Sequence, residues 1–260
     1  MKRILVLLAA TAASCSTPSV SVVPYAAMNS LDGSVASSGS GVAVSTDLDG
    51  LGISDSETVV GGRIDFAGAN SHWSIAHSSS AFEGSGQLDG LLDVGGFEFE
   101  ASAPTDTNME VGTTSVMWTH DWGFGDTAHF GLGLGVTSLS LAMDVTGEVD
   151  DGLGMGGTTT ETGMMDETLP IPMLGVRIGG DVGPVRIEAS YGFLDVDSED
   201  AEVSVTDLDV YAGLDLFGDF GSLVVGYREF AFSAAFEADS DSADLDLTLG
   251  GPYVGVRVGF

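Results

Sequence analysis

The last seven residues, Val254-Gly255-Val256-Arg257-Val258-Gly259-Phe260, alternate between two kinds of side chain. The even positions hold three valines and the terminal phenylalanine, and the odd positions hold glycine or arginine. Successive side chains of a β-strand point to opposite faces of its sheet. The stretch therefore predicts a strand with one apolar face and one face of small or charged residues.

The same period of two recurs backwards along the chain to about residue 58, and its segments end in glycine, aspartate or asparagine. Helical periodicity is hard to find, so we expect an all-β fold. Ten strands are predicted, at 58–67, 71–83, 91–103, 109–122, 127–145, 160–180, 184–196, 202–217, 222–237 and 244–260.

The connections between these segments alternate in kind. Short turns rich in glycine and aspartate occupy 122–126, 180–183 and 217–221. Longer acidic links occupy 147–167, 195–202 and 237–244. Transmembrane β-barrels have short turns at the periplasmic end and longer loops at the outer end, and the alternation seen here is typical of them.

The terminal strand resembles the last strand of Gram-negative outer-membrane β-barrels, where alternating apolar residues close on an aromatic. The resemblance covers about residues 58–260 and is to small barrels of the OmpA/OmpW-like kind. It implies an antiparallel, transmembrane up-and-down β-barrel of about ten strands, within a range of about eight to twelve. It also implies a location in the cell outer membrane, contact with its lipid and lipopolysaccharide, and recognition of Val256, Val258 and Phe260 by the barrel-assembly machinery.

Residues 1–15 have the pattern of a secretory signal peptide, with a basic start, an apolar run of about ten residues and small residues behind it. Cleavage is expected either at the A-x-A site over 10–12 or before Cys15, which follows Ala-Ala-Ser as in a bacterial lipobox and would then be lipidated. The stretch 16–57 is rich in serine, glycine and aspartate, so we expect a flexible segment with one short strand near 41–45.

The charge of the chain excludes some functions. There are 39 acidic and 7 basic residues, a net charge of −32, and beyond Arg3 the chain holds arginines but no lysine. A nucleic-acid-binding protein needs a basic surface, so no nucleic-acid partner is expected. The single cysteine excludes a disulfide scaffold, and an apolar fraction of 43% argues against disorder.

All five arginines beyond Arg3 fall on the face opposite the apolar stripe of their strand. An arginine that points into lipid at mid-depth costs about 2–4 kcal/mol, so a barrel should turn each one into its bore. We therefore predict an inward network of Arg63, Asp65, Arg177, Arg186, Glu188, Arg228 and Arg257. Further acids on the same predicted face are Glu98, Glu100, Asp209, Asp215 and Asp246. A soluble β-sandwich lipoprotein also alternates in this way and stays as the alternative fold.

The sequence holds no P-loop, H-E-x-x-H or G-x-S-x-G motif, so we expect no catalytic, cofactor-binding or metal site and no enzymatic activity. A barrel of so few strands is largely filled by side chains, which favours a structural or surface-interaction role with at most a narrow pore. One alternative is a small-solute channel. Another is an outer-membrane hydrolase that uses His72, which the predicted topology puts near an outer loop beside Ser71 and Ser74.

Acidic clusters occupy the predicted loops, at 47–50, 195–200 and 239–246. Clustered carboxylates are the ligands that hard divalent cations prefer, so such cations are possible partners at these loops. An acidic, lysine-free surface is also an adaptation to saline surroundings, where screening by salt makes the repulsion tolerable. Both interpretations place the loops in ion-rich medium.

Overall fold

The computed structural model describes residues 19–39, 42–48, 53, 56–87, 92–94, 97–99, 104–125, 127–150, 158–198, 201–216, 221–238 and 241–260. The strands are β1 (Ser19–Gly39), β2 (Val42–Asp47), β3 (Ser56–Ala67), β4 (Ser71–Gln87), β5 (Leu92–Val94), β6 (Phe97–Phe99), β7 (Pro104–Phe124), β8 (Ala128–Asp150), β9 (Thr158–Val182), β10 (Val185–Asp197), β11 (Ala201–Asp215), β12 (Gly221–Ala238) and β13 (Asp241–Gly259). No helix in these ranges is long and apolar enough to cross a membrane.

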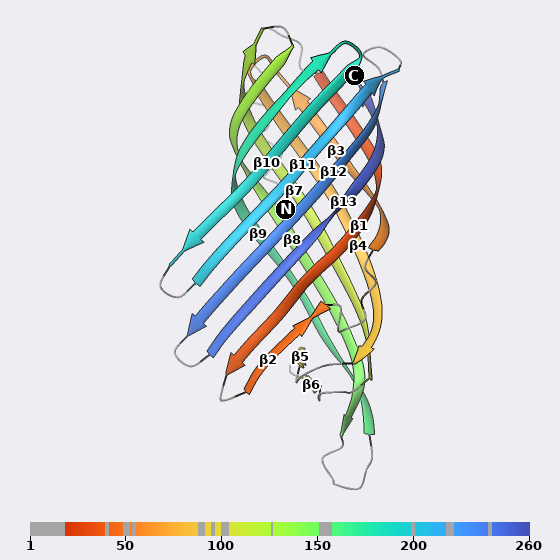
Figure 1. Cartoon of the computed structure of the whole chain (residues 1–260), viewed down its shortest axis with the longest axis vertical. Coiled ribbons are helices and arrows are strands. Elements are labelled where there is room, and N and C mark those ends of the chain that lie inside the picture. Colours follow the sequence, from red (N-terminus) through yellow and green to blue (C-terminus); the bar gives the residue numbers. More distant parts are fainter. Residues whose placement is uncertain are drawn as a thin grey trace, which may run out of the picture.

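Ten of these strands form a closed antiparallel barrel (Figure 1), in the order β1-β3-β4-β7-β8-β9-β10-β11-β12-β13. The ring closes between the first and last strands, where Ser21 pairs with Gly259. Backbone hydrogen bonds extend this closure to the final residue, since the Phe260 N–H donates to the Val20 carbonyl at 2.8 Å. Closure confirms the predicted barrel, and the sandwich alternative is wrong because two packed sheets would leave open edges.

The predicted number of strands is right, but the membership of one is wrong. The segment expected to be flexible, 16–57, supplies β1, a full barrel strand that pairs with both β13 and β3. The short strand expected near 41–45 is β2, which pairs with the far half of β1. In contrast, the predicted strand 91–103 does not join the barrel, because its described parts form only a separate two-stranded sheet, β5–β6, of three residue pairs.

The two ends of the barrel differ. Short connections follow β3, β7, β9 and β11, and lie at the end where β1 begins and β13 finishes, at the top of Figure 1. Gly125 and Gly183 stand in two of these turns with φ of 66° and 61°, a left-handed conformation that favours glycine. The remaining connections lie at the opposite end. We call the two ends the turn end and the loop end.

The polarity of the barrel wall reverses along each strand, and β8 shows this most clearly. Near the turn end Leu134 points outward with 59% of its surface exposed, while the inward positions beside it are glycines. Towards the loop end Leu139 points inward with 2% exposed, and the outward positions become polar, as at Asp144. The register of β8 with β7 is unbroken from Thr105↔Gly147 to Phe124↔Ala128. The shift of the apolar residues to the other face is therefore not a β-bulge.

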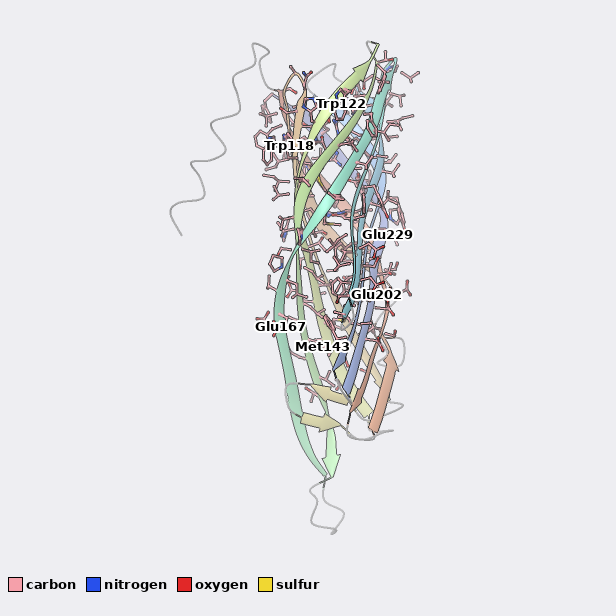
Figure 2. The ribbon with its side chains drawn as sticks, turned by 90° about the vertical axis from the view of Figure 1, so that its left-hand side faces the viewer. Trp118, Trp122, Met143, Glu167, Glu202 and Glu229 are labelled. Carbon is pink, nitrogen blue, oxygen red and sulfur yellow. The ribbon has the colours of Figure 1, made fainter. Side chains whose placement is uncertain are left out.

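We call the half of the barrel near the turn end the membrane zone and the half near the loop end the outer zone. Outward apolar side chains characterise the membrane zone, and acidic side chains lie towards the loop end. Figure 2 shows Trp118 and Trp122 near the turn end, with Glu202 and Glu167 further towards the loop end. Strands of up to 25 residues exceed the roughly 9–11 needed to cross a bilayer, so the outer zone rises beyond it.

The interior of the outer zone is a dry apolar core. Its largest fully buried side chains are Phe82, Phe230, Leu139 and Leu247. The core includes Leu48 and Ile53 from the connection after β2, and Ile53 forms an isolated β-bridge with Gly84 on β4. This bridge matters because the β3–β4 ladder of the described residues stops at Gly62↔His77. The connection therefore packs into the wall where β3 and β4 separate.

Candidate functional site

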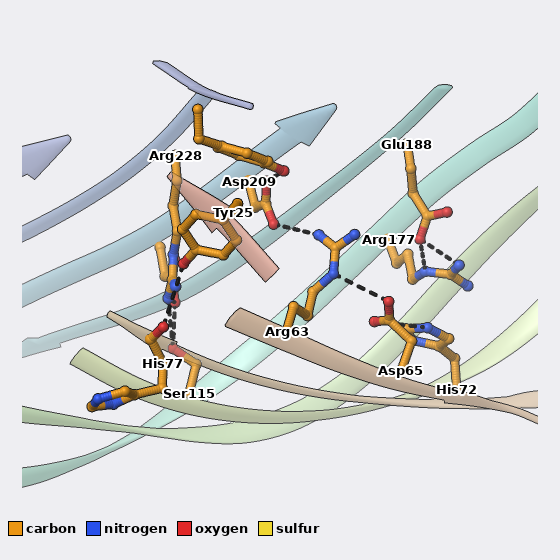
Figure 3. Close-up of polar contacts among 12 residues, drawn as sticks. Tyr25, Arg63, Asp65, His72, His77, Ser115, Arg177, Glu188, Asp209 and Arg228 are labelled. Atoms are coloured by element: carbon orange, nitrogen blue, oxygen red, sulfur yellow. Dashed lines mark hydrogen bonds and ion pairs between the residues drawn. The ribbon is translucent and has the colours of Figure 1, made fainter. Parts of the chain in front are cut away.

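A set of buried ion pairs fills the bore of the membrane zone, and Arg63 on β3 lies at its centre (Figure 3). Its Nε donates to Asp65 Oδ2 at 3.1 Å, and its Nη1 donates across the bore to Asp209 Oδ2 at 2.7 Å. The guanidinium carbon also lies 4.2 Å from the centroid of the Tyr211 ring. Two carboxylates and an aromatic face compensate this buried cation.

Arg177 on β9 forms the second centre, closer to the turn end. Its Nε donates to Glu188 Oε1 on β10 at 2.5 Å, and its Nη1 donates to Asp121 Oδ2 on β7 at 2.5 Å. Alternation places all three side chains inward, because each lies on the face of its strand opposite the lipid-facing residues. The pairs thus join β9 to its neighbour β10 and, past the intervening β8, to β7 from inside the barrel.

Arg228 on β12 forms the third centre, next to the apolar core. It donates from Nη2 to Asp207 Oδ2 at 3.0 Å and to the Ser115 hydroxyl at 3.0 Å. Above it the rings of Tyr25 and Tyr253 pack with centroids 4.8 Å apart. The Tyr253 hydroxyl donates to Asp209 Oδ1 at 2.8 Å, which links this centre to that of Arg63.

The seven predicted residues all face the bore, but they do not form one network. Arg186 pairs with Asp181 at 2.8 Å near the turn end, where 29% of its side chain is exposed. Arg257 has no carboxylate within 4.0 Å among the described residues. Three carboxylate partners were not among the predicted residues: Asp121, Asp181 and Asp207. Each has the inward parity of its strand, which was the available signal.

Of the additional acids predicted to face inward, Asp246 does not do so, and two others are not on described strands of the ring. Asp246 is exposed on the outer wall, because the inward positions of β13 are the odd ones throughout. Glu98 belongs to β6, which is outside the barrel ring, and Glu100 lies outside the described residues. Asp209 and Asp215 do face the bore, and Asp215 accepts a hydrogen bond from Ser222 at 2.5 Å.

The predicted position of His72 near an outer loop is wrong. Because 91–103 adds no strand to the ring, β4 is followed in the ring directly by β7. The directions of β3 and β4 are therefore the reverse of those predicted, and the turn between them lies at the turn end. His72 is buried inside the bore, with Nε2 3.5 Å from Asp65 Oδ1. It is therefore a neighbour of the Arg63 centre, and the rim position assumed for the hydrolase alternative is not present.

From the arginine centres towards the loop end, little free space remains inside the bore of the described chain. A cavity between the three arginine centres offers about 60 Å³ to the centres of water molecules, enough for a few waters. The next space towards the loop end, beside Tyr25 and Tyr253, offers about 10 Å³. Beyond it Phe82 and Phe230 close the bore with almost no exposed surface.

The predicted assembly signal lies on the outward face of the last strand. Val256, Val258 and Phe260 are exposed by 50%, 38% and 79%. Recognition of these residues by the assembly machinery stays a prediction. Cys15, with its predicted lipidation, and the signal peptide lie outside the described residues.

The acidic loops are only partly described. Asp195 and Asp197 are exposed at the end of β10, whereas residues 199–200 and 239–240 lie outside the described residues. Within the ranges that the structure covers, no three His, Cys, Asp or Glu side chains are grouped so that they could hold a metal ion. Cation binding at the loops stays a prediction.

Comparisons with known proteins identify a fold but no sequence family. No family model matches the chain, and no curated protein matches its sequence. Among solved structures, the outer membrane protease OmpT from Escherichia coli superimposes with a TM-score of 0.58 at 9% identity, over 92% of this chain and 97% of that one. The toluene transporter TodX of Pseudomonas putida gives a TM-score of 0.36 at 8% identity, over 95% of this chain and 90% of that one.

Ail, the attachment invasion locus protein of Yersinia pestis, gives a TM-score of 0.32 at 9% identity, over 94% of this chain and all of that one. At such low identity a likeness shows the fold alone. The chain thus has the fold of an outer-membrane β-barrel, which points to the bacterial outer membrane. Membership of the OmpA/OmpW-like group stays a prediction.

Proposed function

We propose that this protein is an outer-membrane barrel with a structural or surface-interaction role, and that it is neither a solute channel nor an enzyme. The apolar core of the outer zone supports this proposal. Phe82, Leu139, Phe230 and Leu247 occupy the bore at the loop end with 0–2% of their surface exposed. An ion that entered from the turn end would have to leave water and pass through this core, which is prohibitively costly for a charge.

The outer wall supports a role at the cell surface. The membrane zone offers lipid a belt of exposed leucine, valine, isoleucine and aromatic side chains. Above this belt, outward positions carry exposed acids such as Glu83, Glu110, Asp144 and Glu202. Every arginine of the described chain faces the bore. Contact with lipopolysaccharide phosphates would therefore need bridging divalent cations, which attract both partners.

Planar-bilayer conductance tests the main part of this proposal. The purified barrel should give no stepwise ion current, whereas a general porin in the same bilayer should. The double variant Phe230→Ala with Leu247→Ala removes two core side chains and serves as a matched control, because a channel held shut only by the core should begin to conduct. Steps of current from the unmodified protein would overturn the proposal.

The surface role has its own test. Vesicles or micelles that contain lipopolysaccharide should bind the folded protein in millimolar Mg²⁺ and release it when a chelator is added. Asp144→Asn with Glu110→Gln should weaken binding, while the inward Asp207→Asn control should not change it if the barrel stays folded. Binding that persists unchanged in the chelator would contradict the role of bridging cations.

A further inference from the structure

The bore opens at the turn end into a polar vestibule where β13, β1 and β12 meet. It consists of two adjoining hollows of about 310 and 300 Å³. Both are lined by Ser19, Ser21, Arg186 and Arg257. Carboxylates line them too, each already paired with an arginine or a serine hydroxyl: Asp215 in the first hollow, and Asp65, Asp121, Asp181 and Glu188 in the second. The vestibule is thus several times larger than the cavity between the arginine centres. It is reached from the turn end, where β1 begins and β13 finishes.

Arg257 is the cation of this vestibule that the described chain does not neutralise. The other four arginines of the barrel each contact at least one carboxylate, while Arg257 has none within 4.0 Å in the ranges described. Its Nε is buried and has no hydrogen-bond acceptor there. The residue as a whole is half-buried. A guanidinium with a buried, unpaired N–H and no anion beside it is unfavourable, so its occurrence in a chain with a large excess of acids needs an explanation.

Ser21 presents a second unsatisfied group to the same space. Its side chain is 3% exposed, and its hydroxyl finds no partner among the described residues. Ser21 pairs with Gly259, so Arg257 is its diagonal neighbour on the inward face of the adjacent strand. Gly259 has no side chain and leaves the space between them open. His129 Nε2, which lines one of the two hollows, is also buried without a partner.

We propose that this vestibule binds an oxyanion group, a phosphate or a carboxylate, of a small molecule that enters from the turn end. The Arg257 Nε–H and the Ser21 O–H would donate to the oxygen atoms, and the guanidinium would supply the compensating charge. Arg186 adds positive charge at the rim, but Asp181 already engages it in two hydrogen bonds. The site lies at the opposite end of the barrel from the surface role proposed above and does not depend on it. If the loop end faces the outside, as that role requires, the turn end faces the periplasm, and the ligand comes from there.

Binding of inorganic phosphate and of acetate to the full chain in detergent, by calorimetry and by the shift in unfolding temperature, tests this site. The unmodified barrel should bind one of the two ions at one site and unfold at a higher temperature in its presence. Arg257→Gln should weaken binding by at least about tenfold, the size expected for loss of a charged hydrogen bond. Ser21→Ala should weaken it several-fold, and the matched control Ser233→Ala, at an exposed outward position of β12, should change it less than about twofold.

Two further arms decide what the site takes. The preference between phosphate and acetate assigns the class of oxyanion. If phosphate is preferred, glycerol phosphate in solution should compete with it, whereas phosphatidylglycerol in the micelle should compete only if the source is a lipid headgroup.

The controls make failure visible. Heat-modifiable gel migration checks that each variant is folded, and Ser21→Ala keeps the test open if Arg257→Gln does not fold. In buffer without phosphate or carboxylate, Arg257→Gln should be at least as stable as the unmodified barrel. A lower unfolding temperature there would mean that the chain itself neutralises Arg257, and the proposal would be wrong. It would also be wrong if neither ion binds, or if both variants bind as well as the unmodified protein.

Discussion

In the membrane zone the barrel is polar inside and apolar outside, whereas in the outer zone the same strands are apolar inside and polar outside. Leu134 and Leu139 on β8 illustrate the difference, since they are five positions apart and point to opposite faces of the wall, Leu134 outward and Leu139 into the core. The backbone does not change between them, because the ladder with β7 continues in register. A periodic pattern therefore fixes the strand, but the surroundings of each face decide which residues are apolar.

The two zones are also held together by different interactions. Lipid takes up the apolar side chains of the membrane zone, so burial of apolar surface inside the protein contributes little there, and ion pairs across the bore take its place. In the outer zone water surrounds the wall, and the hydrophobic effect stabilises the core as it does in a water-soluble protein. The same kind of substitution should therefore change stability by different amounts in the two zones.

The largest effect is expected when the ion pairs of the membrane zone are broken. Arg177→Met leaves Asp121 and Glu188 as buried, uncompensated carboxylates, which should lower the free energy of unfolding by about 4 kcal/mol. Urea unfolding in detergent, followed by tryptophan fluorescence, measures this loss. Adding Asp121→Asn and Glu188→Gln should recover most of it. If the Arg177→Met variant unfolds at the same urea concentration as the unmodified protein, ion pairs do not stabilise this zone.

A somewhat smaller loss is expected when the core of the outer zone loses volume. Leu139→Ala should lower the free energy of unfolding by about 3 kcal/mol, because it removes buried methyl groups and leaves a cavity. Leu139→Met keeps the volume and should cost less than about 1.5 kcal/mol. Equal effects of the two substitutions, by the same urea assay, would show that the outer zone is not packed as a core.

The smallest of the three effects sharpens the comparison on one strand face. Leu134→Arg puts a guanidinium into lipid and should cost about 2–3 kcal/mol. Asp144→Arg lies on the same face of β8 but in the outer zone, and should change stability by no more than about 0.5 kcal/mol. Refolding equilibria in lipid vesicles compare the two variants. Similar costs would mean that the bilayer extends over both positions.

Much of the architecture could be predicted from alternation alone, including the all-β class, the number of barrel strands and the inward direction of the arginines. The first strand could not, because small apolar residues occupy both faces of β1, as at Val23 and Ala26, and leave no contrast between them. The stretch 91–103 does alternate locally, so its pattern predicts a barrel strand that the ring does not contain. That exchange reversed the direction predicted for β3 and β4 and misplaced His72.

Individual partners within the bore were also beyond prediction. Alternation places Arg63 and Asp209 on inward faces, but their contact joins residues separated by 146 positions across a closed barrel. Which carboxylate meets which arginine depends on the stagger of every strand between them. The sequence therefore defines the composition of the bore and leaves its pairing to the three-dimensional register.

The contact between β1 and β13 has a consequence for biogenesis. Each other neighbour in the ring is a strand nearby in the sequence, but this junction joins Ser21 to Gly259, almost the whole length of the polypeptide apart. Because β1 precedes β13 in synthesis and export, β1 has an unpaired backbone edge until β13 is available. Such an edge cannot be tolerated in hydrocarbon. A polypeptide cut before β13 would lack the strand that closes the barrel, so insertion of the closed barrel requires β13.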